Sequence, residues 1–414
     1  MEFKPAIISV AVLPEVVTIP IAGYLTPPQI ATAYNIPAST GSGVKVGIIS
    51  LGGGWLQSDL NTSMTDLGLT PATPRQVLLD GATGTFSTND GNASLENTLD
   101  LYCVATMAPS ADITIYIGVN TTQSFSNAIN RAVNDNCNVI TISWGASEFY
   151  VQGDPLGSAL GNAAAKGISV FCSSGDFGSS SVQPAPYISA GYPASNVNVV
   201  GVGGTYLQLG AGNVRVSESA DSSSGGGISS RFPVPSYQQG LTYQTYSYAG
   251  NLTGPVTPLP RRGVPDIAAP MERYVLFFNG SAVVVGGTSA GTPVMAGMIA
   301  RFTQLNGSRP IALKPTFYAN PHAFYDLTIG NNASYPTNSG YVVTTGWDPV
   351  TGLGAPNGEL LYTALTSGAT SKVKNNLNQW QSIQSVKVKT DDTVWSTVQA
   401  TWVKIDSSSW IKVA

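Results

Sequence analysis

Apolar, β-branched segments alternate with helix-like segments along the first half of the chain, and this alternation constrains the fold more than any other feature. Val44–Ser50, Ile113–Val119 and Ile168–Ser173 have the pattern of buried strands, and Ala93–Met107 and Ser124–Asn134 have the pattern of helices. Such an order indicates a mostly parallel sheet covered by helices on both faces, so we expect an α/β fold. Further elements of these kinds are expected at Arg75–Leu79, Val139–Trp144, Asp154–Lys166 and Val197–Val202.

Composition narrows the classes of function. Charged residues make up only 10% of the 414 residues, against about 25% in ordinary soluble domains. The net charge of −4 does not suggest a nucleic-acid partner, and no apolar run is long enough to span a membrane. Because few charges repel one another when carboxylates become protonated, this composition fits an acidic working environment. It also fits a surface built for assembly.

The stretch from Gly286 to Gly297 carries the first candidate for chemistry. Ala282–Val285 is patterned as a buried strand, Val294–Leu305 as a helix, and Ser289 lies in the glycine-rich turn between them. Pro293 is expected in the first helical turn. Ser289 is therefore either an ordinary helix N-cap or a nucleophile whose main-chain N–H faces a developing negative charge.

A nucleophilic serine needs a base. The single histidine, His322, lies in a turn-like segment, and we assign it a structural role. Glu96 and Asp100 lie four residues apart on one helical pattern and so project from the same face. If buried, they would share a proton and titrate as a pair, whereas an exposed acidic helix start is the alternative.

Asp176 is a third candidate carboxylate. It ends the sequence Ser-Gly-Asp directly after the predicted strand Ile168–Ser173, and sites in parallel sheets gather at the carboxyl ends of strands. The glycine-rich turns after Ser50, Trp144 and Val285 are expected at the same kind of position. An aspartate in an ordinary tight turn is the alternative interpretation of Asp176.

Together these motifs resemble the sedolisins, the serine-carboxyl peptidases with a subtilisin-like fold. The resemblance runs from about Leu25 to Leu365 and rests on the order and number of motifs. The principal matches are Glu96-x-x-x-Asp100, Ser-Gly-Asp176 and Gly-Thr-Ser289-Ala-x-Thr-Pro. Supporting matches are Leu51-Gly-Gly-Gly54, Ile142-Ser-Trp-Gly145, Phe232-Pro-Val-Pro235 and Gly263-Val-Pro-Asp266.

The resemblance implies a role for each candidate residue. Ser289 matches the nucleophile, Glu96 the general base, Asp100 the carboxylate that holds and tunes that glutamate, and Asp176 the oxyanion-site aspartate. It implies hydrolysis of peptide bonds in polypeptide substrates, as an endopeptidase or a tripeptidyl-peptidase. The chemistry suits acid, where a histidine would be protonated but a glutamate keeps basic character, and where a neutral aspartic acid can donate to an oxyanion.

The resemblance also implies one structural calcium ion within residues 324–354. Phe324–Thr328 and Gly346–Gly354 match the family's calcium motifs, and calcium prefers oxygen ligands. The family often has glycine at the position of Thr344, but only a main-chain carbonyl is needed there. Some members also carry a glutamate where this chain has Ser50, which could shift the pH optimum. The implied ligands are the carboxylates of Asp326 and Asp348 and the carbonyls of Leu327, Thr344 and Gly346.

Three parts are expected along the chain: an extended arm (1–24), a peptidase-like domain (25–368) and a small β-rich module (369–414). Family members usually carry a long N-terminal prodomain, whereas some 24 residues precede the match here. Within the module, Val386–Val398 is echoed by Val403–Val413, which predicts two related hairpins or strands. An alternative function is a structural or assembly protein, extracellular or attached to a virion or cell surface, that docks through 371–414.

Overall fold

A computed structural model describes residues 2–7, 9–13, 18–184, 187–249, 251–334 and 337–366, together with six short strands beyond residue 371. Two compact units divide the chain, residues 1–362 and residues 363–414. Among the described residues, none of the helices has both the length and the apolar character that a membrane span requires.

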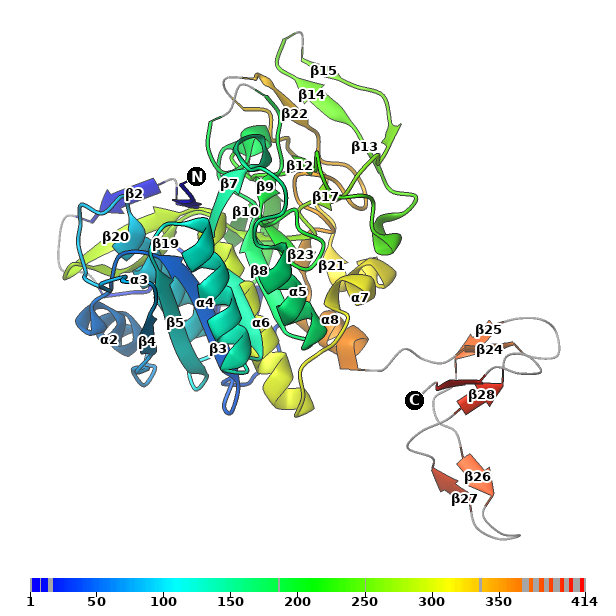
Figure 1. The fold of residues 1–414 in the computed structure, drawn as a ribbon, viewed down its shortest axis with the longest axis horizontal. Coiled ribbons are helices and arrows are strands. Elements are labelled where there is room, and N and C mark those ends of the chain that lie inside the picture. The colour runs from blue at the N-terminus through cyan, green and yellow to red at the C-terminus, as the bar shows by residue number, and fades with distance from the viewer. Residues whose placement is uncertain are drawn as a thin grey trace. The chain divides into compact units, whose positions relative to one another are not determined.

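An eight-stranded sheet forms the centre of the first unit (Figure 1). Its strands pair in the order β11-β10-β8-β6-β3-β5-β4, with β18 also paired to β10, and all pairs except β10–β11 are parallel. The sequence predicted this mostly parallel sheet, and the structure confirms it. The strands are β3 (Lys45–Leu51), β4 (Arg75–Leu78), β5 (Asp112–Gly118), β6 (Val139–Ile142), β8 (Ser169–Ser173), β10 (Val200–Leu209), β11 (Arg215–Ala220) and β18 (Ile267–Pro270).

Helices cover both faces of this sheet, as predicted. Helices α3 and α6 pack against each other on one face, and α4 and α5 pack against each other on the other. Gly297 allows the close approach of α3 and α6, because a Cβ there would lie 2.7 Å from Cγ of Met107. The helices are α1 (Pro27–Ala33), α2 (Gln57–Asp66), α3 (Ala93–Met107), α4 (Thr122–Asn134), α5 (Gly157–Ala165), α6 (Thr288–Asn306), α7 (Leu313–Ala319) and α8 (Gly358–Thr366).

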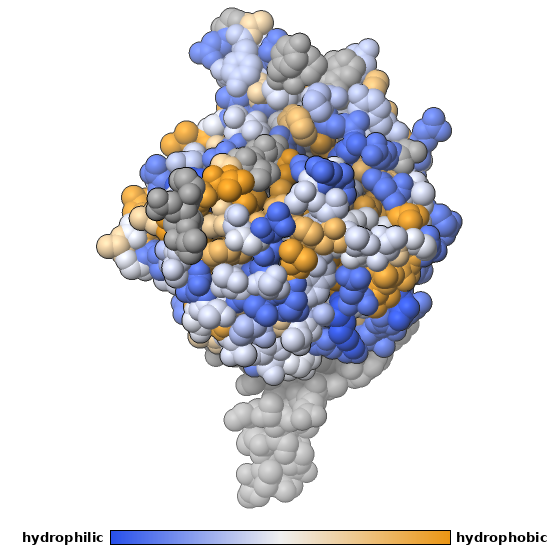
Figure 2. Space-filling view, turned by 90° about the vertical axis from the view of Figure 1, so that its left-hand side faces the viewer, coloured by the Kyte–Doolittle hydropathy of each residue, from blue (hydrophilic) through white to orange (hydrophobic). Residues whose placement is uncertain are grey.

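Small antiparallel sheets surround the central one. The remaining strands of this unit are β1 (Lys4–Pro5), β2 (Ser9–Val12), β7 (Trp144–Ser147), β9 (Gly191–Tyr192), β12 (Gly227–Ile228), β13 (Thr242–Tyr243), β14 (Thr245–Ser247), β15 (Leu252–Thr253), β16 (Thr257–Pro258), β17 (Gly263–Val264), β19 (Tyr274–Phe278), β20 (Ser281–Gly286), β21 (Phe324–Tyr325), β22 (Ser339–Tyr341) and β23 (Ala355–Pro356). The side of the molecule that carries β2 and β20 shows several separate apolar groups among hydrophilic residues (Figure 2).

Strand β20 corrects one prediction. The turn after Val285 was expected at the edge of the parallel sheet, but β20 lies in a separate antiparallel sheet between β19 and β2. The reason is local, because Asn279 and Gly280 both have positive φ and close a tight hairpin between β19 and β20. Asn-Gly is a strong hairpin signal, so the sequence held the information needed to place this strand.

Other boundaries also differ from the prediction, such as that of β10, which runs from Val200 to Leu209 and not from Val197 to Val202. The segment Val139–Trp144 is not one strand, because β6 ends at Ile142 and β7 begins at Trp144 in another sheet. Helix α6 begins at Thr288, so Pro293 lies inside the helix and not in its first turn. Pro293 has no N–H to give to the carbonyl four residues earlier, that of Ser289.

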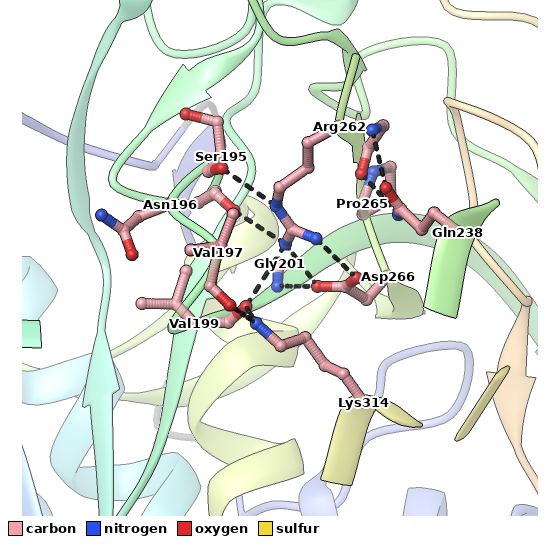
Figure 3. Close-up of polar contacts among 12 residues, drawn as sticks. Ser195, Asn196, Val197, Val199, Gly201, Gln238, Arg262, Pro265, Asp266 and Lys314 are labelled. Carbon is pink, nitrogen blue, oxygen red and sulfur yellow. Dashed lines mark hydrogen bonds and ion pairs between the residues drawn. The ribbon is translucent and has the colours of Figure 1, made fainter. Parts of the chain in front are cut away.

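A buried ion pair joins Arg262, the residue before β17, to Asp266, the residue before β18 (Figure 3). The guanidinium of Arg262 donates to both carboxylate oxygens of Asp266, at 3.1 and 2.8 Å, and its Nε donates to the carbonyl of Ser195 at 2.9 Å. Asp266 also accepts from the N–H of Gly201 in β10, and Lys314 reaches the neighbouring carbonyl of Val199 at 2.7 Å. This network joins β10 and β18 to α7.

Beyond residue 371 the second unit contains three hairpins, β24–β25, β26–β27 and β28–β29. Their first strands begin at residues 372, 387 and 402, and their second strands begin at tryptophans 380, 395 and 410, so the repeat is 15 residues. The sequence predicted the related pattern after residue 386 but did not identify the first copy. The strands are β24 (Lys372–Lys374), β25 (Trp380–Ser382), β26 (Lys387–Lys389), β27 (Trp395–Thr397), β28 (Trp402–Lys404) and β29 (Trp410–Lys412).

Candidate active site

Ser289 is the second residue of α6, and Gly287 is the one residue between the end of β20 at Gly286 and the start of this helix. Gly287 precedes the helix with φ of 142°, a conformation that a side chain would strain. The amide N–H of Ser289 is one of the first-turn donors that have no partner within the helix, and it points at the carbonyl oxygen of Ala6 at 3.3 Å. The hydroxyl of Ser289 donates to the same oxygen.

Glu96 and Asp100 lie on α3, every residue of which is buried. Burial raises the pKa of Glu96 well above its ordinary value, and the neighbouring Asp100 and Asp176 raise it further, while Ser289 and Ser143 lower it. Among the described residues, neither carboxylate oxygen of Glu96 accepts a hydrogen bond. Glu96 thus lies beside Ser289, whose hydroxyl proton is directed at Ala6.

Asp100 titrates together with Glu96. Burial raises the pKa of Asp100 to about 8, although a 2.6 Å hydrogen bond donated by the hydroxyl of Ser143 acts in the opposite direction. The exposed acidic helix start that the sequence left open is wrong, because both side chains are fully buried. Two buried carboxyl groups that interact in this way hold a proton between them over a wide pH range.

Asp176 follows β8 and contacts Thr288, the residue before Ser289. Its Oδ1 accepts from the N–H and the hydroxyl of Thr288, at 2.6 and 2.7 Å, and its Oδ2 has no partner among the described residues. Burial raises its pKa to about 7, and the two hydrogen bonds from Thr288 oppose that rise. The carboxyl group is therefore neutral in acid, with one oxygen free to donate a proton.

Two groups in this region were not singled out from the sequence. Ser143 lies in the gap between β6 and β7, where it donates to Asp100 and accepts the main-chain N–H of Ala6 at 3.0 Å. Its position inside the Ile-Ser-Trp-Gly motif was a usable signal. Ala6 itself was assigned only to an extended arm, and no side-chain pattern marks it.

His322 lies apart from this cluster of hydrogen bonds. It belongs to a short 3-10 helix, Pro321–Ala323, and its side chain is exposed. Ser50, at the end of β3, is buried and donates to Asn97 of α3, which lies next to Glu96 in the chain. A hydroxyl–amide pair thus occupies the place that was considered for an additional carboxylate.

Four of the five predicted calcium ligands contact one another in pairs, and the role of Leu327 stays a prediction. Asp326 accepts from the N–H of Gly346 at 2.9 Å, and Asp348 accepts from the N–H of Thr344 at 3.3 Å. Asp348 is fully buried, and burial raises its pKa to about 7. No cluster of three or more His, Cys, Asp or Glu side chains suited to a metal occurs among the described residues, so an ion here would depend on main-chain carbonyls. Such an all-oxygen set fits calcium and not zinc.

Comparison with known proteins was consistent with this geometry. The subtilase family matches residues 81–346, more than half of the chain. Kumamolisin of Bacillus sp. (strain MN-32) is 34% identical over 361 residues, which cover 83% of this chain and 64% of that protein. Tripeptidyl-peptidase 1 of Dictyostelium discoideum is 31% identical over 286 residues, which cover 64% of this chain and 46% of that protein. The chain thus spans less than two thirds of either relative.

A solved structure, Pseudomonas sedolisin (serine-carboxyl proteinase) complexed with two molecules of pseudo-iodotyrostatin, superposes with a TM-score of 0.69 at 26% identity. The superposition covers 83% of this chain and 98% of that one, so nearly the whole neighbour is represented. The chain therefore belongs to the subtilase family and, within it, to the sedolisins.

Proposed function

We propose that this protein is a serine-carboxyl peptidase that hydrolyses peptide bonds of polypeptide substrates in acid. The observation that carries the proposal is the convergence of Glu96, Asp176 and Ser289 in one buried site, with a peptide carbonyl directed at the serine. The similarity to kumamolisin and to tripeptidyl-peptidases, with less than two thirds of their length covered, supports the same activity.

In this proposal each group has one task. Glu96 takes the proton of Ser289 as the hydroxyl attacks a substrate carbonyl. Asp100 tunes the pKa of Glu96, because the two carboxyl groups titrate as a pair. The N–H of Ser289 and the neutral carboxyl of Asp176 donate to the oxyanion that forms. Asp176 can do so only while protonated, so the site works below about pH 7, the value to which its pKa is raised.

The test is digestion of an unfolded protein at about pH 4, where an ordinary carboxylate begins to ionise. The wild-type chain should release peptides, whereas Ser289→Ala should release none while keeping its circular dichroism spectrum and melting temperature. Equal digestion by both proteins would assign the activity to another site or to a contaminant.

We also propose that the loop around Asp348 binds one structural calcium ion. Asp326 and Asp348 would supply carboxylate oxygens, and Leu327, Thr344 and Gly346 would supply carbonyls; the bound ion would offset the charge of the buried Asp348. Its removal should lower the melting temperature of Ser289→Ala in a calcium-dependent manner, and Asp348→Asn should abolish that dependence. Asp80→Asn, at an exposed aspartate, is the matched control. A melting temperature that changes with neither calcium nor chelator would contradict the proposal.

We infer that the repeated hairpins after residue 371 attach the enzyme to a larger particle or surface. Their regular 15-residue repeat, and the division of the chain into two compact units, support an independent module. A chain ending at Thr366 should digest protein as fast as the full chain but lose retention on the particle or cell envelope of its source. Equal retention of both chains would place attachment elsewhere.

A further inference from the structure

The first residues of the chain lie across the candidate active site as an added strand. Strand β1 pairs antiparallel with β7, so that Lys4 is opposite Gly145 and Pro5 is opposite Trp144. The next residue, Ala6, donates its N–H to the carbonyl of Ser143 at 3.0 Å. Extended peptides bind to sheet edges in this way, through main-chain hydrogen bonds that do not depend on sequence.

The carbonyl of Ala6 occupies the position of a reacting group. It accepts from both the N–H and the hydroxyl of Ser289. A Cβ built on Gly287 would lie 2.1 Å from that carbonyl oxygen and 2.7 Å from Oδ2 of Asp176, so both oxygens border the same small space. The bond that this arrangement presents to the serine is the peptide bond between Ala6 and Ile7.

The contacts of the chain continue to Phe3, the fourth residue before that bond. Phe3 is fully buried, and its main-chain N–H and carbonyl pair with the side-chain amide of Asn120, at 3.0 and 2.8 Å. Its ring meets Phe125 of α4 edge to face, with centroids 4.9 Å apart. An aromatic pair of this geometry adds to the energy of burial. Asn120 and Phe125 therefore hold a specific residue at the fourth position before the bond.

The two residues between Phe3 and Ala6 are less buried than either of them. Lys4 is exposed and forms an ion pair with the exposed Glu2, and Pro5 is half-buried. Strict alternation along a strand would not bury both Phe3 and Ala6, which are three residues apart. Both are nevertheless buried, with the less buried Lys4 and Pro5 between them. Recognition therefore rests on the first and the fourth residues before the bond.

We propose that this enzyme is an endopeptidase that selects an aromatic residue four positions before the cleaved bond and a small residue directly before it. Asn120 binds the main chain of the fourth residue, and Phe125 contacts its aromatic ring. Its own Ala6–Ile7 bond is a substrate of this class. The proposal rests on the proposed peptidase function and deepens it. A tripeptidyl-peptidase binds a free amino group after three residues, whereas here the peptide continues past the third residue, Lys4, into an apolar site.

Cleavage of this bond balances with water as the only co-reactant. The hydroxyl oxygen of Ser289 bonds to the carbonyl carbon of Ala6 while Glu96 takes the proton, and the amide nitrogen of Ile7 leaves with that proton. Water then hydrolyses the ester, which restores Ser289 and leaves a carboxyl group on Ala6. The products are the peptide ending at Ala6 and a chain that begins at Ile7.

The first experiment follows the N-terminus of the full chain by mass spectrometry during incubation at about pH 4. The wild-type chain should come to begin at Ile7, and Ser289→Ala should stay intact. Phe3→Ala should slow the conversion about tenfold or more, since it removes the buried ring. Lys4→Ala is the matched control in the same segment, and its conversion should match that of the wild type because this side chain is exposed.

The second experiment uses peptides, so that folding of the segment does not matter. The processed enzyme receives a quenched peptide with the sequence of residues 2–10, the same peptide with alanine in place of phenylalanine, and a peptide that starts at Lys4 with a free amino group. Only the first should be cut rapidly, between alanine and isoleucine, and Asn120→Asp should reduce that rate. Equally fast release of the tripeptide from the third peptide would overturn the proposal.

Digestion of an unfolded protein separates the two hypotheses. In one outcome, digestion depends on Ser289, but the Ala6–Ile7 bond stays intact and the three peptides are cut alike. The peptidase function then stands, and the proposed binding of an aromatic residue by Asn120 and Phe125 is wrong. Residues 2–6 would then be a structural strand. If no Ser289-dependent digestion occurs at all, both are wrong.

Discussion

The carbonyl oxygen of Ala6 accepts two hydrogen bonds from Ser289, one from the amide N–H at 3.3 Å and one from the hydroxyl. A serine that serves only as a helix N-cap would direct its hydroxyl at its own helix. Here the hydroxyl points at a residue 283 positions earlier in the chain. The N-cap alternative for Ser289 therefore does not describe the structure, in which Gly287 precedes the helix as its cap residue.

Replacement of Asp176 should separate its charge from its donor capacity. Activity of the wild type is expected to fall as pH rises through about 7, where Asp176 loses the proton that it donates. Asp176→Asn keeps an N–H donor that does not titrate, so its remaining activity should lose this alkaline limb. Asp176→Ala removes the donor and should lower kcat by about a hundredfold or more. The measurement is kcat against pH, and an unchanged alkaline limb in Asp176→Asn would assign that limb to another group.

Asp100→Asn should move the acid limb of the pH profile of kcat/KM toward lower pH. The charge of Asp100 raises the pKa of Glu96, so a neutral asparagine lets Glu96 ionise at lower pH. The acid limb of kcat/KM should shift toward lower pH, while kcat falls by about ten- to a hundredfold because the supporting carboxylate is lost. Ser143→Ala is the companion variant, since it removes the hydrogen bond that favours ionised Asp100. A shift of the limb toward higher pH would contradict the assigned coupling.

Folding stability should decrease as pH rises. The folded state raises the pKa of Asp100 to about 8 and that of Asp176 to about 7, so between pH 4 and 8 it binds more protons than the unfolded chain does. This stabilisation is complete below the ordinary aspartate pKa of about 3.9 and is lost as pH rises through the raised values. The loss should be on the order of a few kcal/mol, measured by urea unfolding of Ser289→Ala at pH 5 and 9. Adding Asp176→Asn should reduce the dependence of stability on pH. Greater stability at pH 9 than at pH 5 would contradict the prediction.

Arg262→Leu should destabilise the fold far from the serine. It leaves Asp266 buried without its bidentate partner, and breaking a buried pair in this way typically costs about 3–5 kcal/mol. The double variant Arg262→Leu with Asp266→Leu removes both charges and should recover a large part of that loss. The free energy of unfolding checks both. A single variant as stable as the wild type would show that the ion pair does not hold the turn.

The sequence predicted the parts of the site that side chains encode. Helix α3 was predicted from Ala93 to Met107, the bounds that the structure gives, and its carboxylates lie where their four-residue spacing indicated. The position of β20 was missed because its apolar β-branched run suits either kind of sheet, and the Asn279-Gly280 hairpin signal that decides between them was not used. Ala6 was missed because its contacts are made by main-chain groups, which every residue possesses.

Strand β2 has a consequence for the direction of the reaction. Its ladder with β20 begins where Ser9 pairs with Gly286, so the amino group freed at Ile7 stays tethered beside the acylated serine at a high effective concentration. This amine could attack the ester and religate the chain. In acid it carries a proton, because the pKa of an α-amino group is about 7.7–8.0, and it is then no nucleophile. If the proposed cut occurs, low pH would therefore oppose its reversal, independently of its effect on the carboxylates.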